Sequence, residues 1–365
     1  DVYKRQCANR ASPESLCLTG SSTPPRRGAS SRCSGTMVSN WSVRWKPEFT
    51  SPIIGGMGDT QYWGQFADQA FQEIRRTFLA ERIRVSPERH IEHTYTRVAP
   101  THWVPRDWYR SLGWNGQAVV RGAAVSAESR KAVLVGRWAA AQFGMWALPV
   151  ESAKVSCALP SGNVPSKSKW PEETKFLSMQ IPADDVVELD GVRVTHPLRT
   201  VVDLLRFGDV ASAYAAVSWL LKADVPREDM RAYFDAFASP IRPVYLRMAL
   251  SAADNAVRFQ RFEDAIAWAL LRVDGLRLQT HVSIEGIWTA RIVVEGDLII
   301  EVDTDPYHLS AASEFPELPR KRRERTRWVA AHSYRTLYFT LDEILRDPEG
   351  FVSEVRSSRF LLRWK

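Results

Sequence analysis

Glu301 and Asp303 are the residues whose types and spacing most clearly indicate chemistry. They lie two positions apart at the end of a run rich in β-branched residues, 298–302. Because side chains alternate along a strand, the two carboxylates leave the same face and Val302 points the other way. Two adjacent carboxylates repel each other unless a cation lies between them, so the spacing suits a divalent metal. The structural alternative is that acids at a sheet edge guard against aggregation.

The elements that must position these carboxylates are a hairpin and a helix. Two strand-like runs, Thr289–Val294 and Leu298–Val302, flank Glu295-Gly296-Asp297, and a short polar connection containing Gly predicts a β-hairpin. Upstream, the segment FEDAIAWALLRV predicts a helix that carries Glu263 near its start, where a carboxylate also favours the helix dipole. Downstream, His308 follows the second strand.

A basic run follows within PRKRRERTR, residues 319–327. A solvated helix face is the usual reason for such a run, but six cations in eight residues beside an acidic strand favour a phosphate-facing surface. Contacts of this kind are independent of DNA sequence, and each contributes about −0.9 to the log–log salt slope on duplex DNA. The predicted DNA-binding residues are Arg320, Lys321, Arg322, Arg323, Arg325 and Arg327.

This order of elements resembles the endonuclease-like domain related to very-short-patch repair nucleases, of the PD-(D/E)xK restriction-endonuclease type. The order is a helix with a glutamate, a hairpin, Glu-x-Asp followed by His, a basic helix and the strand RTLYFT. The resemblance implies an α/β/α domain with a central mixed sheet, and metal ligands at Glu301 and Asp303. The matching catalytic positions are Glu263, Glu301, Asp303 and His308, and Glu324 lies in the basic helix.

One position departs from that pattern. The family usually has an Asp on the first hairpin strand, and counting back from Glu301 places that position at about Arg291. Asp297 is the nearest Asp, but it lies in the turn. An arginine there replaces a metal ligand with a cation that repels magnesium. We therefore expect impaired catalysis.

A second resemblance covers the middle of the chain. The stretch GVRVTHPLRTVVDLLRFGDVASAYAAVSWLLK is similar to AbiEi-like proteins of actinobacteria, which are the antitoxin and transcriptional-regulator components of type IV toxin–antitoxin systems. The matching residues are Thr195, Pro197, Arg199, Thr200 and Asp203, and AVLVGRWAAAQFGMWALP is like another helix of that family. The resemblance implies a winged helix-turn-helix near the N-terminus. From the residues alone, Arg199 and Asp203 predict an intrahelical ion pair, and His196 a helix start.

Local patterns predict the other elements of the middle region. Residues 95–108 read as short strands interrupted by prolines, and Ser126–Gly144 as one helix ending at Gly144. The segment VVELDGVRVT predicts a hairpin with an Asp190-Gly191 turn. Helices are expected at 196–208, about 209–222 and 226–237.

Composition narrows the class of protein. The 365 residues are 45% hydrophobic and 25% charged, with no run near the ~20 apolar residues that span a bilayer, so we expect a cytoplasmic protein without membrane contact. Of the net charge of +7, residues 1–50 carry +5, and the rest of the chain only +2. Three of the four cysteines lie in that tail, which excludes a disulfide framework.

These observations predict a multi-domain α+β protein. Residues 1–56 read as a disordered tail, and because DVYKRQ resembles translated sequencing adapter, Met37 or preferably Met57 is the expected start. The domains expected are a degenerate winged-helix-like region at 57–110, an AbiEi antitoxin-like domain at 111–243 and an endonuclease-like domain at 244–365. The predicted function is a DNA-binding antitoxin or regulator carrying an inactive nuclease-like domain, with a cognate toxin as partner. The alternatives are an active magnesium-dependent endonuclease and an antitoxin that binds only protein.

Overall fold

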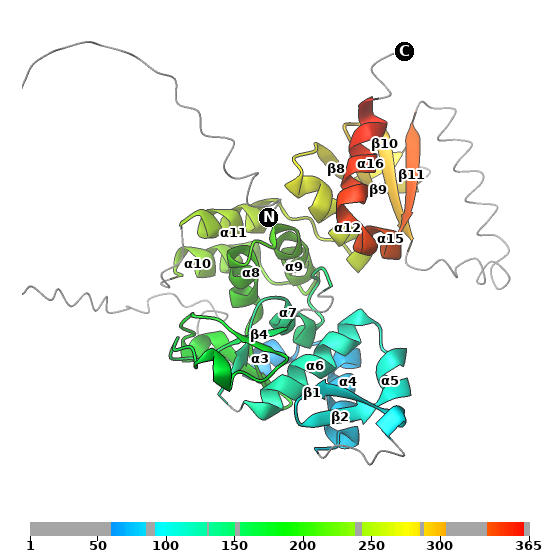
Figure 1. The fold of residues 1–365 in the computed structure, drawn as a ribbon. Helices are drawn as coiled ribbons and strands as arrows, with labels where there is room; N and C mark the ends of the chain where they lie inside the picture. The colour runs from blue at the N-terminus through cyan, green and yellow to red at the C-terminus, as the bar shows by residue number, and fades with distance from the viewer. Residues whose placement is uncertain are drawn as a thin grey trace, which may run out of the picture. The chain divides into compact units, whose positions relative to one another are not determined.

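The computed structural model describes residues 60–84, 92–129, 131–149, 154–237, 243–284, 288–303 and 334–360, which all fall in one compact unit, 51–365. The predicted disordered tail and both candidate start methionines lie outside the described residues. Figure 1 shows the arrangement of the elements along the chain.

The first described elements are two helices and a small hairpin. Helix α3 (Thr60–Gly64) precedes α4 (Gln69–Glu81), which begins after Asp68, whose side chain accepts a hydrogen bond from the Ala70 amide at 2.8 Å. The predicted strands within 95–108 form as far as Pro105. After the short helix η1 (Glu92–Thr94), β1 (Tyr95–Ala99) and β2 (His102–Pro105) pair antiparallel, and α5 (Arg106–Ser111) follows directly.

The single helix predicted over Ser126–Gly144 is wrong. Helix α6 (Trp114–Glu128) ends early, β3 (Val133–Leu134) intervenes, and only α7 (Arg137–Phe143) is helical beyond it. The run Val-Leu-Val favours a strand that pairs with two neighbours, and Gly136 has a φ of +58°, which a helix does not allow. The predicted helix end at Gly144 is confirmed, with a left-handed φ of +73°.

A mixed five-stranded sheet occupies the middle of the chain. Its order is β5-β4-β3-β7-β6, in which β4 and β5 are parallel, β3 and β7 are parallel, and the other pairs are antiparallel. The predicted hairpin is confirmed: Asp190 and Gly191 both have positive φ, as a two-residue turn between twisted strands requires. The remaining strands of this sheet are β4 (Val155–Ala158), β5 (Thr174–Phe176), β6 (Val186–Leu189) and β7 (Val192–Thr195).

Four helices follow this sheet, and the first three confirm the prediction from sequence. Pro197 is the first residue of α8, and Gly208, with φ +83°, follows its end. Helix α9 is buried on nearly all sides because it packs against α8, α11 and α12. The helices are α8 (Pro197–Arg206), α9 (Val210–Lys222), α10 (Arg227–Asp235) and α11 (Pro243–Asn255); the short turns η2 (Lys167–Lys169) and η3 (Ala183–Asp185) precede them.

The last elements form a second, four-stranded mixed sheet with order β11-β10-β9-β8. Strands β8, β9 and β10 are antiparallel neighbours, whereas β11 runs parallel to β10. The predicted hairpin is confirmed, with Glu295 and Gly296 at positive φ in its turn. The elements are α12 (Phe262–Val273), β8 (Leu278–Ile284), β9 (Trp288–Val294), β10 (Leu298–Asp303), β11 (Arg335–Thr340), α15 (Leu341–Arg346) and α16 (Pro348–Phe360).

Helices α12 and α16 contact each other (Figure 1). Side chains of both helices join strand residues such as Ile300 and Val302 in one hydrophobic cluster. The chain between β10 and β11, which includes the predicted basic helix, lies outside the described residues. The architecture confirms a mixed α+β protein with mixed sheets. None of the helices in the described segments has the length and hydrophobicity needed to cross a membrane.

Candidate functional site

The site forms where β9, β10 and the start of α12 meet. Ile300 of β10 pairs with Ile292 of β9 in antiparallel register. Glu301, which follows Ile300, therefore lies opposite Arg291, which precedes Ile292. Their charged groups approach, with 3.9 Å between Arg291 Nη2 and Glu301 Oε2. Glu301 is buried, so its carboxylate has little access to water and needs a cationic or hydrogen-bonding neighbour.

Asp264 in the first turn of α12 completes this contact. Its Oδ2 lies 2.9 Å from Arg291 Nε, which makes it the closer of the two acidic partners of that arginine. The Asp264 side chain is 3% exposed, whereas Arg291 is 35% exposed. One half-exposed guanidinium therefore bridges two buried carboxylates, one from a helix and one from a strand.

Arg261, the residue that precedes α12, adds a second cation. It pairs with Glu263, lies 3.9 Å from Asp264 Oδ2, and donates a hydrogen bond to the carbonyl oxygen of Val302 at 3.2 Å. Acids in the first turn of a helix are favoured by the helix dipole, and the arginine adds a direct charge partner. This residue ties the start of α12 to the end of β10.

The protonation of Asp264 reflects its surroundings. Burial raises the pKa of Asp264 to about 6, and the nearby carboxylates of Glu263 and Glu301 act in the same direction. The guanidinium groups of Arg291 and Arg261 lower the pKa but do not cancel the effect of burial. Asp264 therefore exchanges a proton near pH 6, a property common at functional sites.

The structure brings together some of the residues predicted from sequence. Glu263 and Glu301 both belong to this cluster, and Asp303 lies half-buried at the end of the same strand, paired in register with Thr340. Asp264 was missed, although it directly follows Glu263 in the sequence. His308, Glu324 and the predicted DNA-binding residues 320–327 lie outside the described part of the chain.

A magnesium ion in this cluster would need several oxygen ligands. Within the described segments, no three His, Cys, Asp or Glu side chains are arranged to hold a metal. A guanidinium lies between Asp264 and Glu301, where a divalent ion would need oxygen ligands. As arranged, these residues do not fit a divalent metal.

A second charged cluster, the Asp185 network, lies in the middle of the chain. Asp185 accepts hydrogen bonds from Arg199 at 2.5 Å, from Tyr233 at 3.0 Å, and lies 3.1 Å from Nε2 of His196. Burial alone would raise the pKa of Asp185, but the hydrogen bonds and charges of His196 and Arg199 outweigh it and lower the pKa. His196 is the N-cap of α8, as predicted, and stacks on Trp63 of α3. The hydrogen bonds of Asp185 therefore join η3, which carries it, to α8 and α10.

The predicted ion pair between Arg199 and Asp203 is confirmed, with 3.1 Å between Nε and Oδ1. Asp203 is fully buried, and its Oδ2 has no hydrogen-bond partner among the described residues. Burial raises the pKa of Asp203 to about 6, against the opposing effect of Arg199. Because Arg199 is itself only 1% exposed, we interpret this network as a structural joint.

Comparison with known proteins gives no assignment: no family model, no curated protein and no solved structure matches this chain.

Proposed function

We propose that this protein is a DNA-binding antitoxin or transcriptional regulator of the AbiEi type whose C-terminal region is a catalytically impaired, nuclease-like domain. The observation that carries the proposal is the position of Arg291 between Asp264 and Glu301. A nuclease of the proposed type needs carboxylates that are available to a metal. In this protein Asp264 and Glu301 both contact the guanidinium of Arg291 instead.

The connectivity of the C-terminal elements supports the nuclease-like part of the proposal. Helix α12 is followed by the antiparallel strands β8, β9 and β10, and then by β11, which is parallel to β10. The end of β10 carries the Glu-x-Asp pair, and α12 carries the glutamate that the resemblance implies. A parallel pair requires a crossover connection, and residues 304–333 are long enough to provide one.

Electrostatics supports the loss of catalysis. A divalent metal at this position would have to displace Arg291 from a 2.9 Å contact with Asp264 and would then lie beside the displaced guanidinium. Protonation of Asp264 below about pH 6 removes a further negative charge. Both effects weaken metal binding, and a metal is what supplies the activated water in this class of hydrolysis.

Support for DNA binding among the described residues comes from the N-terminal elements. Helix α4 is followed by the two-stranded β1–β2 hairpin, and Ile83 forms a single antiparallel bridge with Trp103 of β2. A helix followed by such a small sheet is compatible with the predicted winged-helix-like region. Arg84, which follows α4, and Arg110 of α5 are exposed and offer cations for phosphates.

The experiment is cleavage of supercoiled plasmid by the full chain with magnesium or manganese, combined with gel shifts of duplex DNA over a range of salt. We expect DNA binding that weakens as salt rises, without nicking. Nicking that disappears in a Glu301→Ala variant would establish the rival, an active endonuclease. Absence of DNA binding even at low salt would instead leave an antitoxin that acts only on a partner protein.

The role of Arg291 is tested separately by manganese binding, measured by calorimetry. An Arg291→Asp variant removes the cation and adds an oxygen ligand beside Asp264 and Glu301, so we expect it to bind manganese more tightly than the unmodified protein. The matched control is Arg247→Asp, which makes the same charge change at an exposed arginine of α11 that forms no ion pair among the described residues. Equal manganese affinity in all three proteins would refute the argument from Arg291.

A further inference from the structure

A cavity of about 430 Å³ lies on the five-stranded sheet, well separated in sequence from the acidic cluster. Small-molecule pockets span roughly 300–1,000 Å³, so its volume suits a compact ligand. Alternate residues of β4 and β5 line it, because Ser156 pairs with Lys175 and their side chains share one face. Val155 and Cys157 belong to the main hydrophobic core instead.

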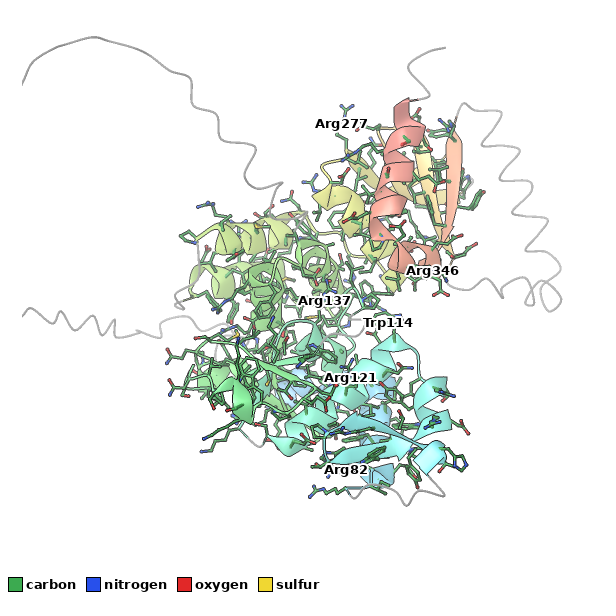
Figure 2. All side chains as sticks on the ribbon, viewed as in Figure 1. Arg82, Trp114, Arg121, Arg137, Arg277 and Arg346 are labelled. Carbon is green, nitrogen blue, oxygen red and sulfur yellow. The ribbon has the colours of Figure 1, made fainter. Side chains whose placement is uncertain are left out.

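The cavity has a cationic side. Lys154 and Lys175 line it, both are exposed, and neither forms an ion pair with any carboxylate in the described segments. Arg137, labelled in Figure 2, also lines the cavity, but its guanidinium pairs with Asp209 and donates to the Pro149 carbonyl at 2.9 Å. Two ammonium groups, one directly before β4 and one on β5, are therefore available for an anion such as a phosphate.

Other lining residues of the cavity are apolar or aromatic. They include Trp138 of α7, the buried Leu204 of α8, and Phe207, which is 41% exposed. The Phe207 ring lies close to Gly136: a Cβ added to that glycine would lie 2.8 Å from Phe207 Cδ2. An exposed ring packed this closely on backbone offers a fixed face for a planar group.

We propose that this cavity binds a nucleotide, with its phosphate between Lys154 and Lys175 and its base against the ring of Phe207. Base stacking on an aromatic side chain tolerates any base, and lysine contacts to phosphate add charge without base selectivity. The ligand is either a free mononucleotide or an unpaired nucleotide of a single strand.

Calorimetry with the full chain tests this, using AMP, inorganic phosphate and a short single-stranded oligonucleotide as separate ligands. We expect AMP or the oligonucleotide to bind more tightly than phosphate. AMP binding identifies a free nucleotide as a source, and binding of the oligonucleotide alone identifies a nucleic acid. No binding of either at millimolar concentration, or phosphate binding as tightly as AMP, would overturn the proposal.

Variants locate the binding. Lys154→Gln with Lys175→Gln should weaken nucleotide binding about 25- to 100-fold, because each lost charged contact costs roughly five- to tenfold. The matched control, Lys167→Gln with Lys169→Gln, removes two exposed lysines of η2 and should leave affinity unchanged. Phe207→Ala should weaken binding about tenfold. Equal losses in both lysine pairs would show general electrostatic attraction and refute the site.

Discussion

Replacing Asp264 with Asn is expected to stabilise the protein at neutral pH, although it removes an ion pair. The pKa of Asp264 is about 6, above its ordinary value of 3.8, so the folded state disfavours the ionised carboxylate. At about 1.36 kcal/mol for each pH unit, this difference corresponds to roughly 3 kcal/mol. Asn resembles the protonated acid and avoids that cost.

The sign follows from proton linkage. Between about pH 4 and 6 the folded protein keeps the Asp264 proton while the unfolded chain has lost it, so the stability of the unmodified protein falls as pH rises through this window. The Asn variant does not titrate at this position. Its advantage should therefore be absent near pH 4, grow up to about pH 6, and remain constant above.

The assay is thermal unfolding at a series of pH values between 4 and 8.5. For a chain of this size roughly 2 °C accompanies each kcal/mol, so we expect a midpoint about 6 °C higher for Asp264→Asn at pH 8. Asp235→Asn, at an exposed aspartate of α10, is the matched control and should change the midpoint little at any pH. A variant less stable than the unmodified protein at pH 8 would show that the Arg291 contact outweighs burial.

Three further predictions concern the middle of the chain. Arg199→Met leaves Asp203 buried without its cation and should destabilise the fold by about 3–5 kcal/mol, measured by urea unfolding. Gly136→Ala should lower the thermal midpoint because φ is +58° and the new Cβ meets Phe207; adding Phe207→Ala should recover only the steric part, so full recovery would contradict a backbone cost. Burial raises the pKa of Cys157 to about 12, so peptide mass spectrometry should find it alkylated at pH 8 only after unfolding.

Local residue patterns predicted much of the fold because turns and caps depend on a few neighbouring residues. Asp190-Gly191 and Glu295-Gly296 predicted two hairpins, and Gly144 a helix end, since each needs a backbone with positive φ. The helix predicted across Gly136 was wrong because the preceding strand is stabilised by partners distant in sequence. Tertiary pairing there overrides local propensity.

The candidate site was predictable only in part for a related reason. The alternation of side chains along a strand predicted which face of β10 carries Glu301. Counting back across the hairpin turn predicted that Arg291 lies on the neighbouring strand, and the register puts the two residues opposite each other. Glu263 and Asp264 are adjacent acids in the first turn of α12, and the sequence does not reveal which one faces the sheet. Which of the two acids faces the sheet depends on the rotation of α12 about its axis. That rotation is set by the packing of the apolar face of α12 in the hydrophobic core.

The two charged clusters use the same arrangement of one arginine between two buried acids, and exposure separates their roles. Arg199 lies between Asp185 and Asp203 and is 1% exposed, so no external group can reach it without unfolding the joint. Arg291 contacts Asp264 but is 35% exposed, so an incoming anion can compete for its guanidinium.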